Sequence, residues 1–289
     1  MGVDDPSALP PDPRRDWSRL DRAARDAAYD NNAAVPDSAA RAAARNAASA
    51  AYRAAHPGAL DIPYGTAPRE AFDLYPAADP AAPCLVFIHG GYWQRNSREL
   101  FACFAEGPAA AGWSVAMPGY TLAPEASLTT ISAEIGRALD WLGRHGPAHG
   151  IAGPLVLAGW SAGAQLAAIH LSHPAVAAGL AISGVYELAP IRDTGLNDAL
   201  KLTDDEVATL SPLRLPITRK LLAIAYGTAE RPALVHDARA FHARRSADHA
   251  PGPLIPIAGA DHFSILDELR RPGGVLVRAA IDLVKGLSA

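Results

Sequence analysis

Cysteine is scarce in this sequence, and long apolar runs are absent. Only Cys84 and Cys103 occur among the 289 residues, and both lie in apolar segments. We expect two buried thiols rather than a disulfide, which suits a reducing compartment such as the cytoplasm. No apolar stretch reaches the roughly 18 residues that a transmembrane helix requires, so we expect no membrane partner.

The charge balance argues against a nucleic-acid-binding protein, and the first residues argue against a signal peptide. Lysine and arginine together number 26 against 30 aspartates and glutamates, which leaves a net charge of −4. A nucleic-acid-binding protein usually carries a basic patch, and this composition indicates none. The first residues are acidic and rich in proline, unlike the basic start and apolar core of a signal peptide. The expected location is therefore the cytoplasm.

Apolar runs alternate with helical patterns along most of the chain. Strand patterns occur near 71–75, 85–88, 113–117, 154–158, 179–182, 221–226 and 254–257, and helical patterns near 97–110, 127–144, 164–171, 233–247 and 274–287. This order predicts an α/β fold with a mainly parallel sheet and helices on both faces. Pro256 cannot donate a hydrogen bond to the ladder, so we expect the last strand at an edge.

The remaining segments define the expected domain organisation. Residues 1–15 hold four prolines and several charges, which favours a flexible N-terminal arm. Residues 16–289 are expected to form a single domain. Within it, the alanine-rich residues 16–60 predict a helical cover that Asn31, Asn32 and Pro36 interrupt. Residues 187–219 lack a strand pattern and predict a small cap-like insertion over the site.

One serine lies between glycines at a predicted strand-to-helix turn. Gly159-Trp160-Ser161-Ala162-Gly163 follows the apolar run 154–158 and precedes a helical run. Gly-x-Ser-x-Gly in this context is typical of a nucleophile elbow, a sharp turn that exposes the serine hydroxyl above the sheet. Glycine suits both flanking positions because it has no Cβ to clash. The alternative is a glycine-flanked serine in an ordinary turn.

A nucleophilic serine needs a base, usually a histidine that a carboxylate orients. In the elbow fold these residues follow one another in the order serine, acid, histidine. Among ten histidines, His262 is the one that directly follows the last predicted strand. Glu230 lies just past the preceding strand and is the favoured acid. Asp237, expected within a helix, remains the alternative.

Glycines at the end of an early strand predict hydrogen-bond donors for an oxyanion. His89-Gly90-Gly91-Tyr92 matches the HGG-type loop that supplies backbone N–H groups beside a nucleophile elbow. Together with the N–H of Ala162, they would lie where negative charge develops during acyl transfer. The alternative is a simple glycine turn.

Six aromatic residues lie next to these motifs, although the whole chain has only 5 Trp, 8 Tyr and 6 Phe. They are Tyr92, Trp93, Tyr120, Trp160, Tyr186 and Phe263. We expect them to bind substrate, because a flat aromatic molecule can stack on such rings. For Trp160 and Phe263, packing in the core is an equal alternative.

Three runs together resemble the arylformamidase (kynurenine formamidase) branch of the α/β-hydrolases, which is similar to the hormone-sensitive-lipase-like esterases. They are HGGYWQ at 89–94, GWSAGA at 159–164 and DHF at 261–263. Tyr-Asp-Asn-Asn at 29–32 also resembles the N-terminal segment of bacterial members. Glu230 resembles the family's acid, but residues 231–237 lengthen the usual spacing to the next helix, so Asp237 stays open.

This resemblance implies hydrolysis of an N-formyl arylamine by Ser161 and His262, without a metal or organic cofactor. A carboxylesterase acting on small aryl or alkyl esters is the first alternative, because the same triad cleaves both bonds. A non-catalytic binding protein on a hydrolase fold is the second, and the presence of both Ser161 and His262 argues against it. The expected partner is a small, aromatic substrate, and a homodimer is compatible with the class.

Overall fold

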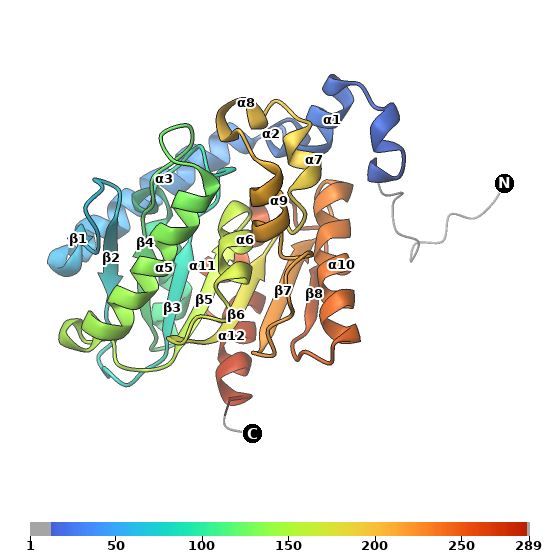
Figure 1. Cartoon of the computed structure of the whole chain (residues 1–289). Helices are drawn as coiled ribbons and strands as arrows, with labels where there is room; N and C mark the ends of the chain where they lie inside the picture. The colour runs from blue at the N-terminus through green and yellow to red at the C-terminus, as the bar shows by residue number, and fades with distance from the viewer. Residues whose placement is uncertain (1–12, 288–289) are drawn as a thin grey trace.

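A central sheet organises the computed structural model, which describes residues 13–287 (Figure 1). The predicted flexible arm, 1–15, lies almost entirely outside these residues. Within them, eight strands form one sheet in the order β1-β2-β4-β3-β5-β6-β7-β8. The strands are β1 (Ile62–Pro63), β2 (Ala71–Tyr75), β3 (Cys84–Ile88), β4 (Ser114–Pro118), β5 (Leu155–Trp160), β6 (Val176–Ile182), β7 (Leu222–Gly227) and β8 (Leu254–Ile257). The pairs β1–β2 and β2–β4 are antiparallel, and the other five pairs are parallel.

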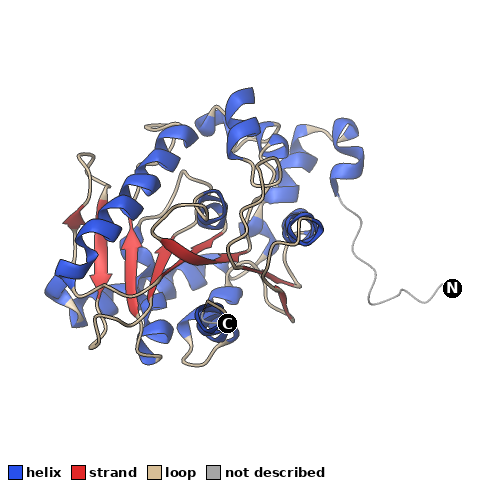
Figure 2. Ribbon diagram, turned by 60° about the horizontal axis from the view of Figure 1, so that its bottom comes forward, coloured by secondary structure: helices blue, strands red, loops and turns tan. Residues whose placement is uncertain are grey.

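Helices cover both faces of this sheet (Figure 2). The α-helices are α1 (Arg22–Tyr29), α2 (Asn31–Ala34), α3 (Ser38–Ala55), α4 (Glu106–Ala110), α5 (Leu128–His145), α6 (Ala162–Ile169), α7 (Ala189–Arg192), α8 (Asn197–Leu200), α9 (Asp204–Leu210), α10 (Pro232–Ala247), α11 (Asp267–Arg270) and α12 (Val275–Lys285). Short 3₁₀ helices are η1 (Pro13–Arg19), η2 (Pro57–Ala59), η3 (Arg98–Ala105), η4 (Gly146–His149) and η5 (Ser264–Leu266). None of the described helices is both long and apolar enough to cross a membrane.

Strand β3 shows how the sequence separates the two halves of the core. Successive side chains point to opposite faces of a strand, and all five residues of β3 are buried. Cys84, Val86 and Ile88 join the core that α5, α6 and α10 cover, whereas Leu85 and Phe87 join the core beneath η3, α11 and α12. A strand buried on both faces needs a continuous apolar run, and the sequence has one at this place.

The predicted fold class is confirmed, and three elements differ from prediction in detail. β8, which holds Pro256, lies at one edge of the sheet as expected. The two-residue strand β1 was missed, because two residues carry no periodic signal. The helix predicted near 97–110 is a 3₁₀ helix, η3, followed by the short α4. The alanine-rich N-terminal region forms α1, α2 and α3, with the second helix beginning at Asn31.

The N-terminal helices lie beside α7, α8 and α9, above the carboxyl ends of the central strands (Figure 1). Polar contacts join the two regions. The Trp17 indole donates to Asp193 at 2.8 Å, and the Gly195 N–H donates to Asp26 at 2.6 Å. Helix α3 continues along the sheet and packs against η3. The two segments together therefore form a cover over one end of the sheet.

The turn from β5 into α6 brings two stretches of backbone into direct contact. Ser161 occupies it with φ 57° and ψ −121°, a region that residues other than glycine rarely adopt. A Cβ at Gly159 would lie 2.0 Å from the Gly163 carbonyl oxygen, and one at Gly163 would lie 2.1 Å from the Ile88 oxygen. Backbone atoms cannot rotate away as side chains can, so both positions require glycine.

We expect Gly159→Ala to lower the free energy of unfolding by about 3 kcal/mol, because the added methyl overlaps backbone. Urea denaturation followed by circular dichroism measures this loss. Gly136→Ala is the matched control, since a Cβ there meets only a ring atom of His170 at 3.4 Å. That change within α5 should be neutral or stabilising. Equal stability of the two variants would contradict the expectation.

His89 follows β3 and is buried against two aromatic rings. Its ring stacks on Tyr120 at 4.4 Å between centroids and lies 5.7 Å from Phe101. Burial lowers the pKa of His89 to about 4. In the unfolded chain the ring titrates near its ordinary pKa of about 6.5. Between pH 6.5 and pH 4 the unfolded state therefore binds the proton more readily, and stability falls as the pH falls.

Between pH 6.5 and pH 4, protonation of His89 in the unfolded state should lower the unfolding free energy of the wild type by up to about 3 kcal/mol. A His89→Gln variant lacks this titrating group, so its unfolding free energy should fall by that much less over the same pH range. The measurement is urea denaturation at several pH values, with the slope against pH as the readout. The slope does not depend on the variant's absolute stability. Parallel curves for the two proteins would show that His89 titrates normally in the fold.

Candidate active site

A cavity of about 440 Å³ lies at the carboxyl ends of the central strands. Its volume is within the usual range for small-molecule sites. Separate segments line it: parts of 26–45 from the N-terminal cover, 91–96 after β3, 160–161 at the β5–α6 turn, 194–196, and 262–263 after β8. The cavity thus gathers most of the motifs that the sequence singled out.

Ser161 and His262 both line this cavity, and both are almost fully buried. Nδ1 of His262 lies 3.0 Å from Oε2 of Glu230. A carboxylate accepts a hydrogen bond from an N–H at that distance, so the Nδ1–H tautomer is favoured and Nε2 keeps its lone pair. The Trp160 indole donates to the His262 carbonyl oxygen at 2.9 Å, and its ring lies 4.8 Å from the imidazole. These contacts hold the orientation of the His262 ring.

Glu230 is held at its other oxygen by two further donors. Oε1 accepts from the Ser183 hydroxyl at 2.5 Å and from the Gly227 N–H at 2.7 Å. The side chain is fully buried, so each of these bonds offsets part of the desolvation cost of a carboxylate. The sequence analysis missed Ser183, although its position directly after β6 places it at the same end of the sheet as Ser161.

Asp237, the alternative acid, lies elsewhere. It is fully buried in α10, where its carboxylate accepts from the Tyr186 N–H at 2.8 Å. Glu230 instead lies in a tight turn after β7, with its own N–H donating to the Gly227 carbonyl oxygen. That turn directs the Glu230 side chain toward the loop after β8. Of the two carboxylates, Glu230 is the one in contact with His262.

The loop after β3 lies directly against the Ser161 turn. A Cβ at Gly90 would meet the Trp160 carbonyl oxygen at 2.6 Å and the Ser161 Cβ at 2.8 Å. Gly91 and Tyr92 both line the cavity and have positive φ values of 126° and 51°. Within residues 13–287, the backbone N–H groups of Gly91, Tyr92 and Ala162 donate no hydrogen bond. These donors are therefore available to a bound molecule.

The structure separates the six aromatic candidates into two groups. Tyr92, Trp160 and Phe263 line the cavity. Trp93, Tyr120 and Tyr186 do not, because all three are buried in the core.

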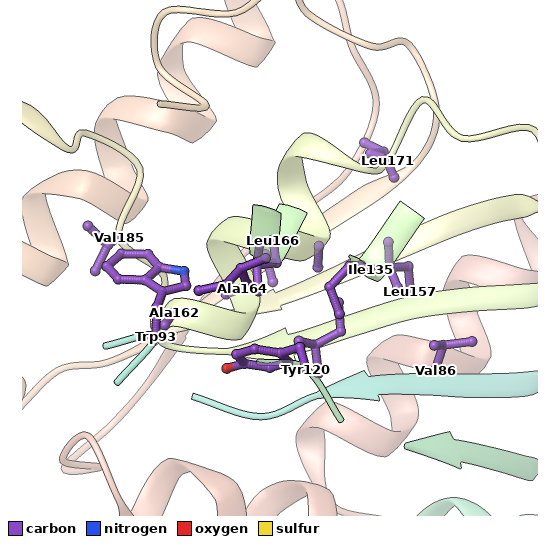
Figure 3. Close-up of a cluster of buried hydrophobic side chains, with 14 of the residues drawn as sticks. Val86, Trp93, Tyr120, Ile135, Leu157, Ala162, Ala164, Leu166, Leu171 and Val185 are labelled. Atoms are coloured by element: carbon purple, nitrogen blue, oxygen red, sulfur yellow. The ribbon is translucent and has the colours of Figure 1, made fainter. Parts of the chain in front are cut away.

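Their core contacts explain this correction. The Trp93 indole donates to the Gln165 amide oxygen at 3.1 Å, and Tyr120 packs on His89. Figure 3 shows Trp93 and Tyr120 among buried hydrophobic side chains. Tyr186 stacks on Phe241 at 4.7 Å. Such large rings contribute more to stability inside the core than on a cavity wall.

The N-terminal cover contributes a wall that the sequence analysis did not assign to the site. The Tyr92 hydroxyl donates to the Tyr29 carbonyl oxygen at 2.7 Å and accepts from the Asn31 amide at 3.2 Å. Asn31 and Arg45 line the cavity. The sequence feature that could have pointed to this wall is the run at 29–32, which was used only as a family resemblance. Among the described residues, no group of three or more His, Cys, Asp and Glu is placed to hold a metal ion.

Comparisons with known proteins agree with this geometry. A family described by its alpha/beta hydrolase fold matches residues 85–264. The kynurenine formamidase of Danio rerio is 26% identical over 78% of this chain and 81% of its own length, and that of Salmo salar is 28% identical over 73% and 76%. A crystal structure of a candidate thioesterase from Silicibacter sp. TM1040 is 29% identical, with a TM-score of 0.79 over 89% of this chain and 98% of its own.

These matches confirm the resemblance to arylformamidases that the sequence motifs indicated. The family match covers more than half of the chain, including Ser161, Glu230 and His262. The chain belongs to the family of proteins with the α/β hydrolase fold, and it is a hydrolase.

Proposed function

We propose that this protein is a serine hydrolase that removes a formyl group from an arylamine such as N-formylkynurenine. The observation that carries the proposal is the contact of the buried Glu230 with His262, which lines the same cavity as Ser161. A histidine oriented by a buried carboxylate can act as a general base, and a serine within its reach then becomes a nucleophile. The likeness to kynurenine formamidases supports the choice of a formamide.

The proposed reaction has two halves, transfer of the formyl group to Ser161 and its release to water, and His262 carries the proton in both. The Ser161 hydroxyl attacks the formyl carbon while Nε2 of His262 accepts its proton. The C–N bond then breaks as His262 returns that proton to the leaving amine, and the formyl group remains on Ser161 as an ester. Water then attacks this ester while His262 accepts its proton. The bond between the formyl carbon and Ser161 Oγ breaks as His262 returns that proton to Oγ, which releases formate and restores the serine hydroxyl.

Negative charge develops on the formyl oxygen in both tetrahedral intermediates. We assign its stabilisation to the N–H groups of Gly91, Tyr92 and Ala162, which form no hydrogen bond within the described part of the chain. Donors that already point at the developing charge need no reorganisation during the reaction. Gly90 allows their loop to approach Ser161, and Glu230 keeps the imidazole in the productive tautomer.

Hydrolysis of a small ester is the second candidate. The same residues would cleave it, and an alkoxide or phenoxide leaves more readily than an amine. The likeness to the candidate thioesterase from Silicibacter sp. TM1040 favours this alternative. The relative rates on a formamide and an ester distinguish the two candidates. Because the triad can cleave both bonds, any preference between the two substrates comes from the shape and polarity of the cavity.

We expect kcat/KM for N-formylkynurenine to exceed that for p-nitrophenyl acetate, measured on one enzyme preparation. Ser161→Ala should lower kcat on both substrates by about 10⁵-fold or more, because no other group can take the acyl. A preference for the ester with negligible formamide turnover would make the esterase the correct function. Substantial activity of the Ser161→Ala variant would overturn the mechanism for both.

The two buried carboxylates provide a matched test of the acid. Glu230→Gln should lower kcat by about 10³- to 10⁴-fold with little change in KM, because an amide cannot favour the same imidazole tautomer. Asp237→Asn should weaken the bond from the Tyr186 N–H and lower thermal stability. Its kcat, normalised by active-site titration, should stay within a few-fold of wild type. The reverse pattern would identify Asp237 as the acid.

A further inference from the structure

The cavity wall contains a positive charge that no anionic group in the described part of the chain pairs with. Arg45, on α3, is half-buried and lines both the cavity with Ser161 and a neighbouring cavity of about 160 Å³. Its guanidinium donates through Nε and Nη2 to the neutral amide oxygen of Asn46, at 3.1 and 2.9 Å. No ion pair to Arg45 occurs within residues 13–287.

The charged groups around Arg45 are engaged elsewhere or are neutral. Asp267 lines the neighbouring cavity, but the cations that act on its carboxyl are Arg41 and Arg270. The Cys103 thiol lies nearby, and burial raises its pKa, so it is protonated at neutral pH. Burial also lowers the pKa of the Arg45 guanidinium, as expected for a cation without a compensating anion. Arginine nevertheless stays charged at all physiological pH values.

Arg45 is also held in a fixed orientation before any ligand arrives. Its guanidinium carbon lies 4.3 Å from the centroid of the Phe101 ring, within the range of a cation–π contact. The bonds to Asn46 fix one edge of the planar group, and Nη1 remains available. Arg95 also lines the cavity, but its side chain is exposed to solvent, which screens its charge. Arg45 is therefore the better placed of the two for a bound anion.

We propose that Arg45 binds a carboxylate on the substrate's leaving group, so that the enzyme selects aryl formamides that carry an acid function. A guanidinium and a carboxylate form charge-assisted bonds, which are the stronger class of hydrogen bond. Asp26 and Asp30 line the same cavity, so a substrate that also carries an ammonium group meets charges of both signs.

This inference rests on the proposed function, and a matched substrate pair tests it separately. N-formylkynurenine and N-formylkynuramine differ only by the carboxylate, and the formyl arylamine that reacts is the same. We expect wild type to show a kcat/KM ratio of about 10- to 100-fold in favour of the carboxylate substrate. Arg45→Met should reduce that ratio to within about 3-fold, mainly through a higher KM for N-formylkynurenine. Arg45→Lys should restore part of it.

The ratio is independent of how much of each variant is folded, because both substrates are measured on one preparation. Arg25→Met is the matched control. Arg25 is also half-buried on the N-terminal cover, and its guanidinium lies over Trp17 at 5.7 Å, but it lines neither cavity. Its substitution should leave the ratio unchanged. An unchanged ratio in Arg45→Met, or an equal loss on both substrates, would overturn the role of Arg45.

Failure of the formamidase proposal can be distinguished from failure of the Arg45 proposal. If neither formamide is hydrolysed but esters are, the comparison moves to acetylsalicylate and phenyl acetate, which again differ by one carboxylate. A preference for acetylsalicylate that disappears in Arg45→Met would support the carboxylate site in an esterase. Equal ratios in wild type and Arg45→Met would overturn it there as well.

Discussion

The close approach of three backbone segments around Ser161 is the constraint on which the site depends. Gly159 and Gly163 allow β5 and α6 to meet within a single turn, and Gly90 allows the loop after β3 to lie against that turn. A Cβ at any of these positions would overlap backbone atoms. The positive φ of Ser161 follows from this packing, because the chain must reverse direction between the end of β5 and the start of α6.

Parallel strands then bring the other groups to the same place. β5, β6, β7 and β8 are adjacent in the sheet, and Ser161, Ser183, Glu230 and His262 follow them in that order. Each residue lies within a few positions of its strand end, so little loop is needed to join them. The contact of Glu230 with Ser183 and Gly227 shows that neighbouring strands also support the acid. Rigid strands therefore hold the geometry while short loops carry the reactive groups.

The cover is the part of the molecule that distinguishes this cavity. Residues from α1, α2 and α3 line it, and the Tyr92 hydroxyl ties the cover to the loop after β3. Its charged side chains, Asp26, Asp30 and Arg45, add polar groups to the cavity wall. Arg45 is the clearest case, because a half-buried cation without an anion is unfavourable unless a ligand supplies one.

The sequence by itself determined the order of the longer strands and helices, the edge position of β8 and the motifs around Ser161, Gly91 and His262. These rest on local patterns: periodicity, glycine requirements and position relative to a strand. Only the tertiary structure brought Glu230 rather than Asp237 to His262, placed Trp93, Tyr120 and Tyr186 in the core, and made Arg45 part of the cavity. Those outcomes depend on which side chains meet across separate elements, and local patterns carry no information about such distant contacts.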